Sequence, residues 1–281
     1  MPHPTFRHEA MATYFEIVVA GQEHEYARQA SAAAFRDLDR LENTLSRYIE
    51  SSDIARANRL ERGACMAITE DTLECLLIAA DVSLATRRAF DPAYASVRPA
   101  ELPADIPPFT LDPDAHTLTS LAERLHLDLG AVGKGFALDR MAEVLGEWGI
   151  TSATLNAGGS SVLALDAPPP DSRSGWEVGL GEGRGYRTIP LLSASLSGSG
   201  TAVKGSHLID PRTGEPAPRT TRVWALSPTA AQADALSTAF FVMNEAEIAA
   251  LCADHPSVGA GIAGVDEELI VHGALRTALG A

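Results

Sequence analysis

The sequence lacks several features that would assign a protein to a class directly. No apolar run approaches the ~18 residues that a membrane-spanning helix needs, so we expect no membrane span. The three cysteines (Cys65, Cys75 and Cys252) show no CxxC or other metal-ligand spacing, and we expect them to be scattered, reduced thiols. Lys and Arg total 22 against 37 Asp and Glu, a formal charge of −15, which argues against a non-specific nucleic-acid surface.

The N-terminal segment, MPHPTFRHEAMATYF, also lacks an apolar signal core and a cysteine for lipid attachment. We therefore expect a cytoplasmic protein from the chain as written, or a periplasmic one if a leader has been removed. A length of 281 residues is enough to bury a sizeable core, and we expect residues 1–281 to form a single domain.

The stretch from Leu125 to Gly149 is the most informative part of the sequence. An alternating apolar segment ends at Leu129, a glycine-rich loop follows, and then comes a helix with a strongly periodic apolar face. The free backbone N–H groups of such a loop and helix N-terminus form a natural anion site. Lys134 adds a positive charge within that loop.

The phosphate-binding P-loop pattern, GxxxxGK[ST], does not fit this stretch. Aligning Gly133-Lys134 with the pattern places Asp128 at the first glycine and Gly135 where the magnesium-binding hydroxyl belongs. Taken alone, the stretch favours a glycine-rich turn between a strand and a helix that carries a surface lysine over a phosphate site.

A second informative segment is the expected helix at residues 229–243. Asp234 and Thr238 lie at i and i+4, so both oxygens project from one helix face, with Ser237 beside them. A carboxylate and hydroxyls suit a hard cation such as Mg²⁺. By themselves, however, Asp and Thr in an alanine-rich helix are more often solvated or bonded back to the helix.

Around these motifs the pattern predicts a mixed α/β (α+β) fold with antiparallel strands. Proline and acidic residues at 100–113 favour an irregular connection there. We expect helices at about 25–45, 53–58, 70–84, 134–148, 229–243 and 245–253. We expect strands at about 12–20, 64–68, 125–129, 152–156, 162–165, 176–179, 188–192, 193–197, 222–226, 259–263 and 268–272.

Seven segments together resemble the ApbE family of FAD:protein FMN transferases, in the same order along the chain. Each match is weak when it is considered alone. The matching segments are Met11-Ala12-Thr13, 46–58, Phe90-Asp91-Pro92, Asp128 to Asp139, Asn156 to Gly159, His207 to Gly214, and 233–238.

The resemblance implies two intertwined lobes with antiparallel or mixed sheets and flanking helices, and an FAD site between the lobes. It also implies Mg²⁺-dependent transfer of FMN from FAD to a threonine of an acceptor flavoprotein with an Asp-Gly-x-Thr-Ser-Gly/Ala segment, releasing AMP. The family pattern places metal ligands at Asp234, Thr238, Ser237 and the main-chain oxygen near Ala131. His207 is the candidate general base for the acceptor hydroxyl. Flavin-site positions fall on Met11, Tyr48, Phe90, Asp91, Pro92, Asp128, Lys134, His207 and Ile209.

The sequence departs from the family pattern at several of these positions. Ala12 stands in place of a glycine, Ser160 in place of an aspartate, and Leu196 in place of a threonine. Ala131-Val132-Gly133 also stands where Gly-Gly-Ile-Ala is usual. Two alternatives therefore remain beside the transferase: an enzyme that hydrolyses FAD to FMN and AMP, and a non-catalytic FAD-binding protein.

Overall fold

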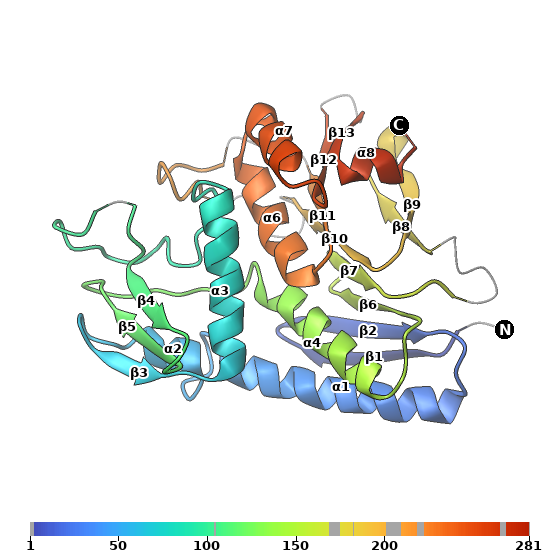
Figure 1. The fold of residues 1–281 in the computed structure, drawn as a ribbon, viewed down its shortest axis with the longest axis horizontal. Helices are drawn as coiled ribbons and strands as arrows, with labels where there is room; N and C mark the ends of the chain where they lie inside the picture. The colour runs from blue at the N-terminus through green and yellow to red at the C-terminus, as the bar shows by residue number, and fades with distance from the viewer. Residues whose placement is uncertain are drawn as a thin grey trace.

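The computed structural model describes residues 3–103, 105–168, 175–181, 183–200, 209–217, 222–264 and 268–280. It has two lobes, one built on a large antiparallel sheet and the other on a small one (Figure 1). The chain begins in the lobe with the large sheet, crosses to the small lobe, and then returns. The lobes are therefore intertwined, and the expectation of a mixed α/β fold is confirmed.

The large sheet is antiparallel at every pair of neighbouring strands that the structure describes. Along β2 and β6 alternate side chains are buried beneath helices, as their alternating apolar pattern predicts. In spatial order the strands are β1 (Thr5–Ala10), β2 (Thr13–Val19), β6 (Ala153–Ala157), β7 (Ser161–Ala164), β10 (Ala194–Ser199), β11 (Val223–Ser227), β12 (Gly259–Ala263) and β13 (Leu269–Gly273).

Helices α1 (His24–Leu45), α4 (Gly133–Glu147) and α6 (Ala230–Val242) cover one face of this sheet (Figure 1). Helix α6 lies between strands β10 and β11 and helix α3 (Glu70–Ala85) of the small lobe. Its many alanines allow neighbours to approach from all sides, and most of its residues are buried. A smaller core on the sheet's opposite face includes residues of hairpin β8 (Trp176–Leu180) and β9 (Arg187–Leu191) and of helix α8 (Ala274–Ala278).

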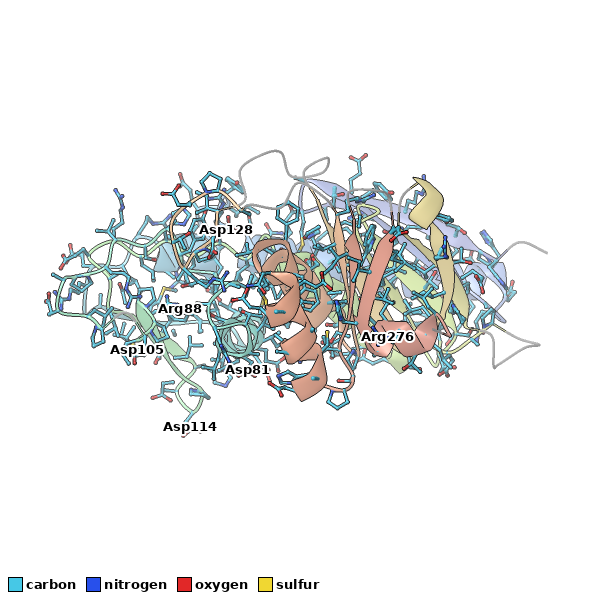
Figure 2. All side chains as sticks on the ribbon, turned by 90° about the horizontal axis from the view of Figure 1, so that it is seen from above. Asp81, Arg88, Asp105, Asp114, Asp128 and Arg276 are labelled. Carbon is cyan, nitrogen blue, oxygen red and sulfur yellow. The ribbon has the colours of Figure 1, made fainter. Side chains whose placement is uncertain are left out.

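The small lobe contains α2 (Asp53–Ala57), α3 and a three-stranded antiparallel sheet of β3 (Cys65–Ala67), β5 (Thr117–Ser120) and β4 (Phe109–Asp112). Ser52 caps α2 and Thr69 caps α3, as the sequence indicates. Figure 2 shows Asp128 and Arg88 where this lobe approaches α6, with Asp105 and Asp114 farther out in the same lobe. In the other lobe, α7 (Glu245–Asp254) follows α6.

Two expectations about local structure are wrong, and one strand was not expected. Strand β4 forms inside the 100–113 segment expected to be irregular, because residues 109–112 pair with β5. Residues 125–129 alternate between buried and partly exposed positions as expected, yet they form no strand. Their backbone makes isolated hydrogen bonds, such as that from the N–H of Asp128 to Pro92, and does not pair with a neighbouring strand. Strand β1 was not anticipated, because its residues are mostly polar. No helix among the described residues has the length and apolarity needed to cross a membrane.

Candidate functional site

The glycine-rich loop is tied to the small lobe before α4 begins. The backbone N–H of Asp128 donates to the carbonyl oxygen of Pro92 at 2.9 Å. The Asp128 carboxylate in turn accepts from the N–H of Gly130 at 2.9 Å. Two segments singled out in the sequence, the loop and the 90–92 turn, therefore lie side by side.

Lys134 and Asp234 form an ion pair at the start of α4. Lys134 Nζ lies 2.9 Å from Asp234 Oδ2 and 3.1 Å from Oδ1, and the N–H of Gly135 donates to Oδ2 at 3.3 Å. Asp234 is only 2% exposed, so the alternative interpretation, in which it lies on a solvated helix face, is wrong. The carboxylate is buried because α6 is enclosed by the sheet and α3, and Lys134 supplies the opposite charge that a buried carboxylate needs.

Two serines of the large sheet complete the surroundings of Asp234. The hydroxyls of Ser161 on β7 and Ser197 on β10 each donate to Asp234 Oδ1 at 3.3 Å, and their oxygens are 2.8 Å apart. Neither serine is among the site residues expected from the sequence. The only signal was a polar residue at an inward-facing strand position, which many proteins tolerate.

The two hydroxyls expected near a metal differ in their surroundings. Ser237 is fully buried, and its Oγ donates to the backbone oxygen of Asp234 at 2.8 Å and lies 2.9 Å from Ser199 Oγ on β10. Thr238, the next residue, instead lines a cavity between the lobes. The structure therefore brings Asp234 and Thr238 onto the side of α6 where the loop lies, whereas Ser237 faces the sheet.

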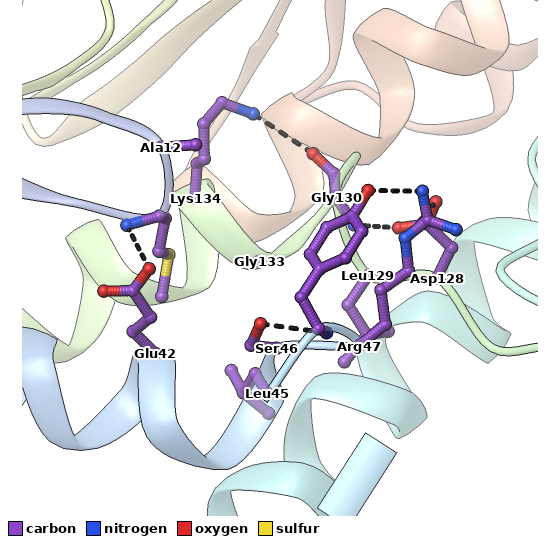
Figure 3. A pocket seen from close by; sticks show the side chains of 12 residues that line it. Ala12, Glu42, Leu45, Ser46, Arg47, Asp128, Leu129, Gly130, Gly133 and Lys134 are labelled. Atoms are coloured by element: carbon purple, nitrogen blue, oxygen red, sulfur yellow. Dashed lines mark hydrogen bonds and ion pairs between the residues drawn. The ribbon is translucent and has the colours of Figure 1, made fainter. Parts of the chain in front are cut away.

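Most of the expected flavin and metal positions line two adjoining cavities. The larger has a volume of about 540 Å³, within the usual range for ligand sites. The smaller, of about 190 Å³, includes Met11 in its lining. Lys134 also lines it (Figure 3). Arg47, Tyr48, Asp128 and Gly130 line both. Expected site residues in the larger cavity are Tyr48, Phe90, Asp91, Pro92, Asp128, Ala131, Ile209 and Thr238.

Tyr48 stands where the two cavities meet and is 78% exposed. The guanidinium of Arg47 donates to its hydroxyl at 2.5 Å and lies 4.6 Å from its ring centroid (Figure 3). Arg47 also lies 3.5 Å from the Asp128 carboxylate. Arg47 thus holds the aromatic ring and the loop together, a role that its sequence position did not indicate.

The hairpin turn at Met11 is held from the side by α1. The N–H of Met11 donates to Glu42 Oε1 at 2.8 Å (Figure 3). Met11 and Ala12 have φ values of 50° and 56°, the left-handed region that a glycine adopts more readily. The resemblance places a glycine at position 12, and the backbone here explains that preference.

The segment expected to supply a general base is described only in part. His207 lies outside the described residues. Ile209 lines the larger cavity, and the carboxylate of Asp210, next along the chain, accepts from Arg212 Nη2 at 2.9 Å.

The donor set near Asp234 suits a hard cation. Asp234 supplies a carboxylate. Thr238 and Ala131, which line the larger cavity, can offer a hydroxyl and a main-chain oxygen. Mg²⁺ usually takes one or two carboxylates and completes its shell with waters and substrate phosphates. This fits the described residues, among which no three His, Cys, Asp or Glu side chains converge as a metal cage would require.

Comparison with known proteins agrees with this arrangement. A sequence model of the ApbE family matches residues 11–262. The chain belongs to the ApbE family. An FAD:protein FMN transferase of Treponema pallidum is 32% identical over 165 residues, which are 52% of this chain and 45% of that protein. Another, of Rhodobacter capsulatus, is 28% identical over 270 residues, 83% of this chain and 50% of that protein. The chain thus spans about half the length of these two relatives.

Solved structures of the family share the fold. The flavin transferase ApbE of Vibrio cholerae superposes with a TM-score of 0.81 at 20% identity, covering 99% of this chain and 100% of that one. The ApbE protein of Thermotoga maritima gives a TM-score of 0.80 at 23% identity and covers 99% of each chain. The family fold is therefore confirmed for this chain.

Proposed function

We propose that this chain is an FAD:protein FMN transferase. The observation that carries the proposal is the Lys134–Asp234 ion pair, which lies beside cavities lined by all of the described residues expected in a flavin site. The matched relatives carry this name. In the proposed reaction the hydroxyl of an acceptor threonine forms a bond to the FMN phosphorus, the bond from that phosphorus to the bridging oxygen breaks, and AMP leaves.

The residues of this chain have separable roles in that reaction. Lys134 would bind the diphosphate, and the exposed ring of Tyr48 would lie against the isoalloxazine. Asp234, Thr238 and the Ala131 carbonyl would hold Mg²⁺, which when bound supplies positive charge to the phosphate oxygens. His207 is the proposed base that takes the proton of the threonine hydroxyl, while the leaving AMP oxygen carries the electron pair of the broken bond.

The test is to incubate the protein with FAD, Mg²⁺ and an acceptor domain bearing the Asp-Gly-x-Thr-Ser-Gly/Ala segment, and then to weigh that domain. We expect its mass to rise by FMN less one water, with AMP released in equal amount. An acceptor with the threonine replaced by alanine serves as the control. Rapid release of FMN and AMP without labelling would identify a hydrolase, and binding of FAD without cleavage would identify a non-catalytic flavin protein.

A further inference from the structure

Asp139 of α4 caps the beginning of α6. Its two carboxylate oxygens accept from the backbone N–H groups of Ala230 and Ala231, each at 2.8 Å. These are the first two residues of α6, and the N–H groups of a first helical turn have no partner within the helix. A side chain of one helix thus holds the N-terminus of another, 91 residues away in the sequence.

Gly135 makes the same two helices approach closely. A Cβ atom at this position would lie 2.0 Å from the carbonyl oxygen of Ala230 and 2.8 Å from the Cα of Ala231, so a larger residue would force the backbones apart. Gly135 and Asp139 are four residues apart and share one face of α4. We call these two residues, with Ala230 and Ala231, the α4–α6 clamp.

The clamp lies one residue from Lys134 on α4 and three residues from Asp234 on α6. The N–H of Gly135 itself donates to Asp234 Oδ2 at 3.3 Å, so a clamp residue contacts the ion pair directly. A shift of the first turn of α6 along α4 would therefore change the separation of Lys134 and Asp234. The position of the α4–α6 clamp therefore affects the geometry of the Lys134–Asp234 ion pair.

We propose that Asp139 is a positioning residue, which through the α4–α6 clamp holds Lys134 and Asp234 in the geometry needed for phosphoryl chemistry. This inference rests on the proposed function for its catalytic consequence. The structural consequence, the separation of Lys134 and Asp234, does not depend on that function. Asp139 lines neither of the two cavities, and its hydrogen bonds go to Ala230 and Ala231, so its proposed role is to place α6.

A stabilising cap with no such role is the alternative, and the chain offers a matched control. Asn244 caps its own helix, α7, since its side-chain oxygen accepts from the N–H of Glu247 at 2.9 Å. Asn244 lines neither of the two cavities that hold the expected flavin residues. The variant N244A therefore removes a helix cap of similar type without touching the clamp.

The experiment compares D139A, D139N and N244A for thermal unfolding, for FAD affinity in the presence of Mg²⁺, and for kcat and KM of FMN transfer. We expect D139A to lose at least tenfold in kcat and tenfold in FAD affinity relative to N244A, after correction for the folded fraction. D139N keeps one acceptor oxygen, and we expect it to fall between wild type and D139A. If D139A does not fold, the same comparison is made with D139N alone.

A crystal structure of D139N or D139A separates failure of this inference from failure of the proposed function. We expect Lys134 Nζ to lie farther from the Asp234 carboxylate than the 2.9 Å of the unaltered chain. An unchanged separation together with FAD affinity equal to that of N244A would overturn the positioning role, whatever the activity. Failure of the wild type to label an acceptor would overturn the transferase proposal, while the separation and the FAD affinity would still decide the role of Asp139.

Discussion

Lys134 Nζ lies 2.9 Å from Asp234 Oδ2, although 100 positions separate the two residues in the sequence. The pair joins the loop at the start of α4 to the second turn of α6. Because both side chains are largely withdrawn from water, loss of one leaves the other as an uncompensated buried charge. This relationship changes what a substitution at either position should do.

Replacing Asp234 with alanine should abolish FMN transfer and also lower the free energy of unfolding, by about 3 kcal/mol. The cost arises because Lys134, Ser161 and Ser197 all lose their shared acceptor. Urea denaturation and the transfer assay measure the two effects. The double variant K134A/D234A should regain part of the stability but none of the activity. A single variant as stable as wild type would contradict the buried pairing.

Replacing Lys134 with alanine should weaken FAD binding by roughly 1.5–3 kcal/mol, the usual size of a charge-assisted contact. FMN lacks the second phosphate, so the unaltered protein should bind FAD more tightly than FMN when Mg²⁺ is present. Isothermal titration with each flavin checks both statements. Equal affinities for FAD and FMN in the wild type would count against the diphosphate position assigned here.

Replacing Tyr48 with alanine should raise FAD hydrolysis relative to FMN transfer. The exposed ring at the meeting of the two cavities is positioned to cover a flavin and to exclude water from the phosphorus. The matched control is Y48F, which keeps the ring and loses only the hydroxyl bonded to Arg47. Chromatographic measurement of free FMN against labelled acceptor gives the ratio, and an unchanged ratio in Y48A would refute the covering role.

Replacing Ala12 with glycine should stabilise the protein by about 1 kcal/mol, because Ala12 has a φ of 56° and glycine adopts this region without a Cβ clash. Thermal or urea unfolding measures the gain. The neighbouring turn residue Met11 has a similar φ but a side chain that lines the smaller cavity, so M11G should gain less and should also weaken FAD binding. A destabilised A12G would show that the turn is not strained.

Asp139 should make stability depend on pH. Burial raises the pKa of its carboxyl from 3.8 to about 6, against the opposite effect of its two backbone hydrogen bonds. The folded state therefore holds the proton more tightly than the unfolded state. The resulting stabilisation is fully present below pH 3.8 and is lost as the pH rises through about 6.

The variant D139N has no group that titrates at this position. The difference in unfolding free energy, wild type minus D139N, should therefore fall as the pH is raised from about 4 to about 6.5. Urea denaturation across this range measures the difference, and N244A should follow the wild-type profile in parallel. A pH-independent difference between wild type and D139N would contradict the raised pKa.

Local pattern was sufficient to predict most of the helices and strands. Thr69 begins α3 and Gly149 follows the end of α4, as their residue types indicate. Such signals act over a single helical turn, so they can be recognised from the sequence alone. Strand β4 was missed because its pairing with β5 outweighs the composition around it. Pairing partners lie outside any local window, so a short strand in a proline-rich segment carries no local signal.

The sequence by itself determined the family pattern, the order of its segments and the residue types available for phosphate and metal binding. Only the tertiary structure decided that Asp234 is buried, that Lys134 reaches it, and that Ser161 and Ser197 share it. The helical spacing of Asp234 and Thr238 specifies which face they share, but not what packs against that face. Burial and ion pairing depend on distant segments meeting, and here the close approach of α4 and α6 at Gly135 brings those segments together.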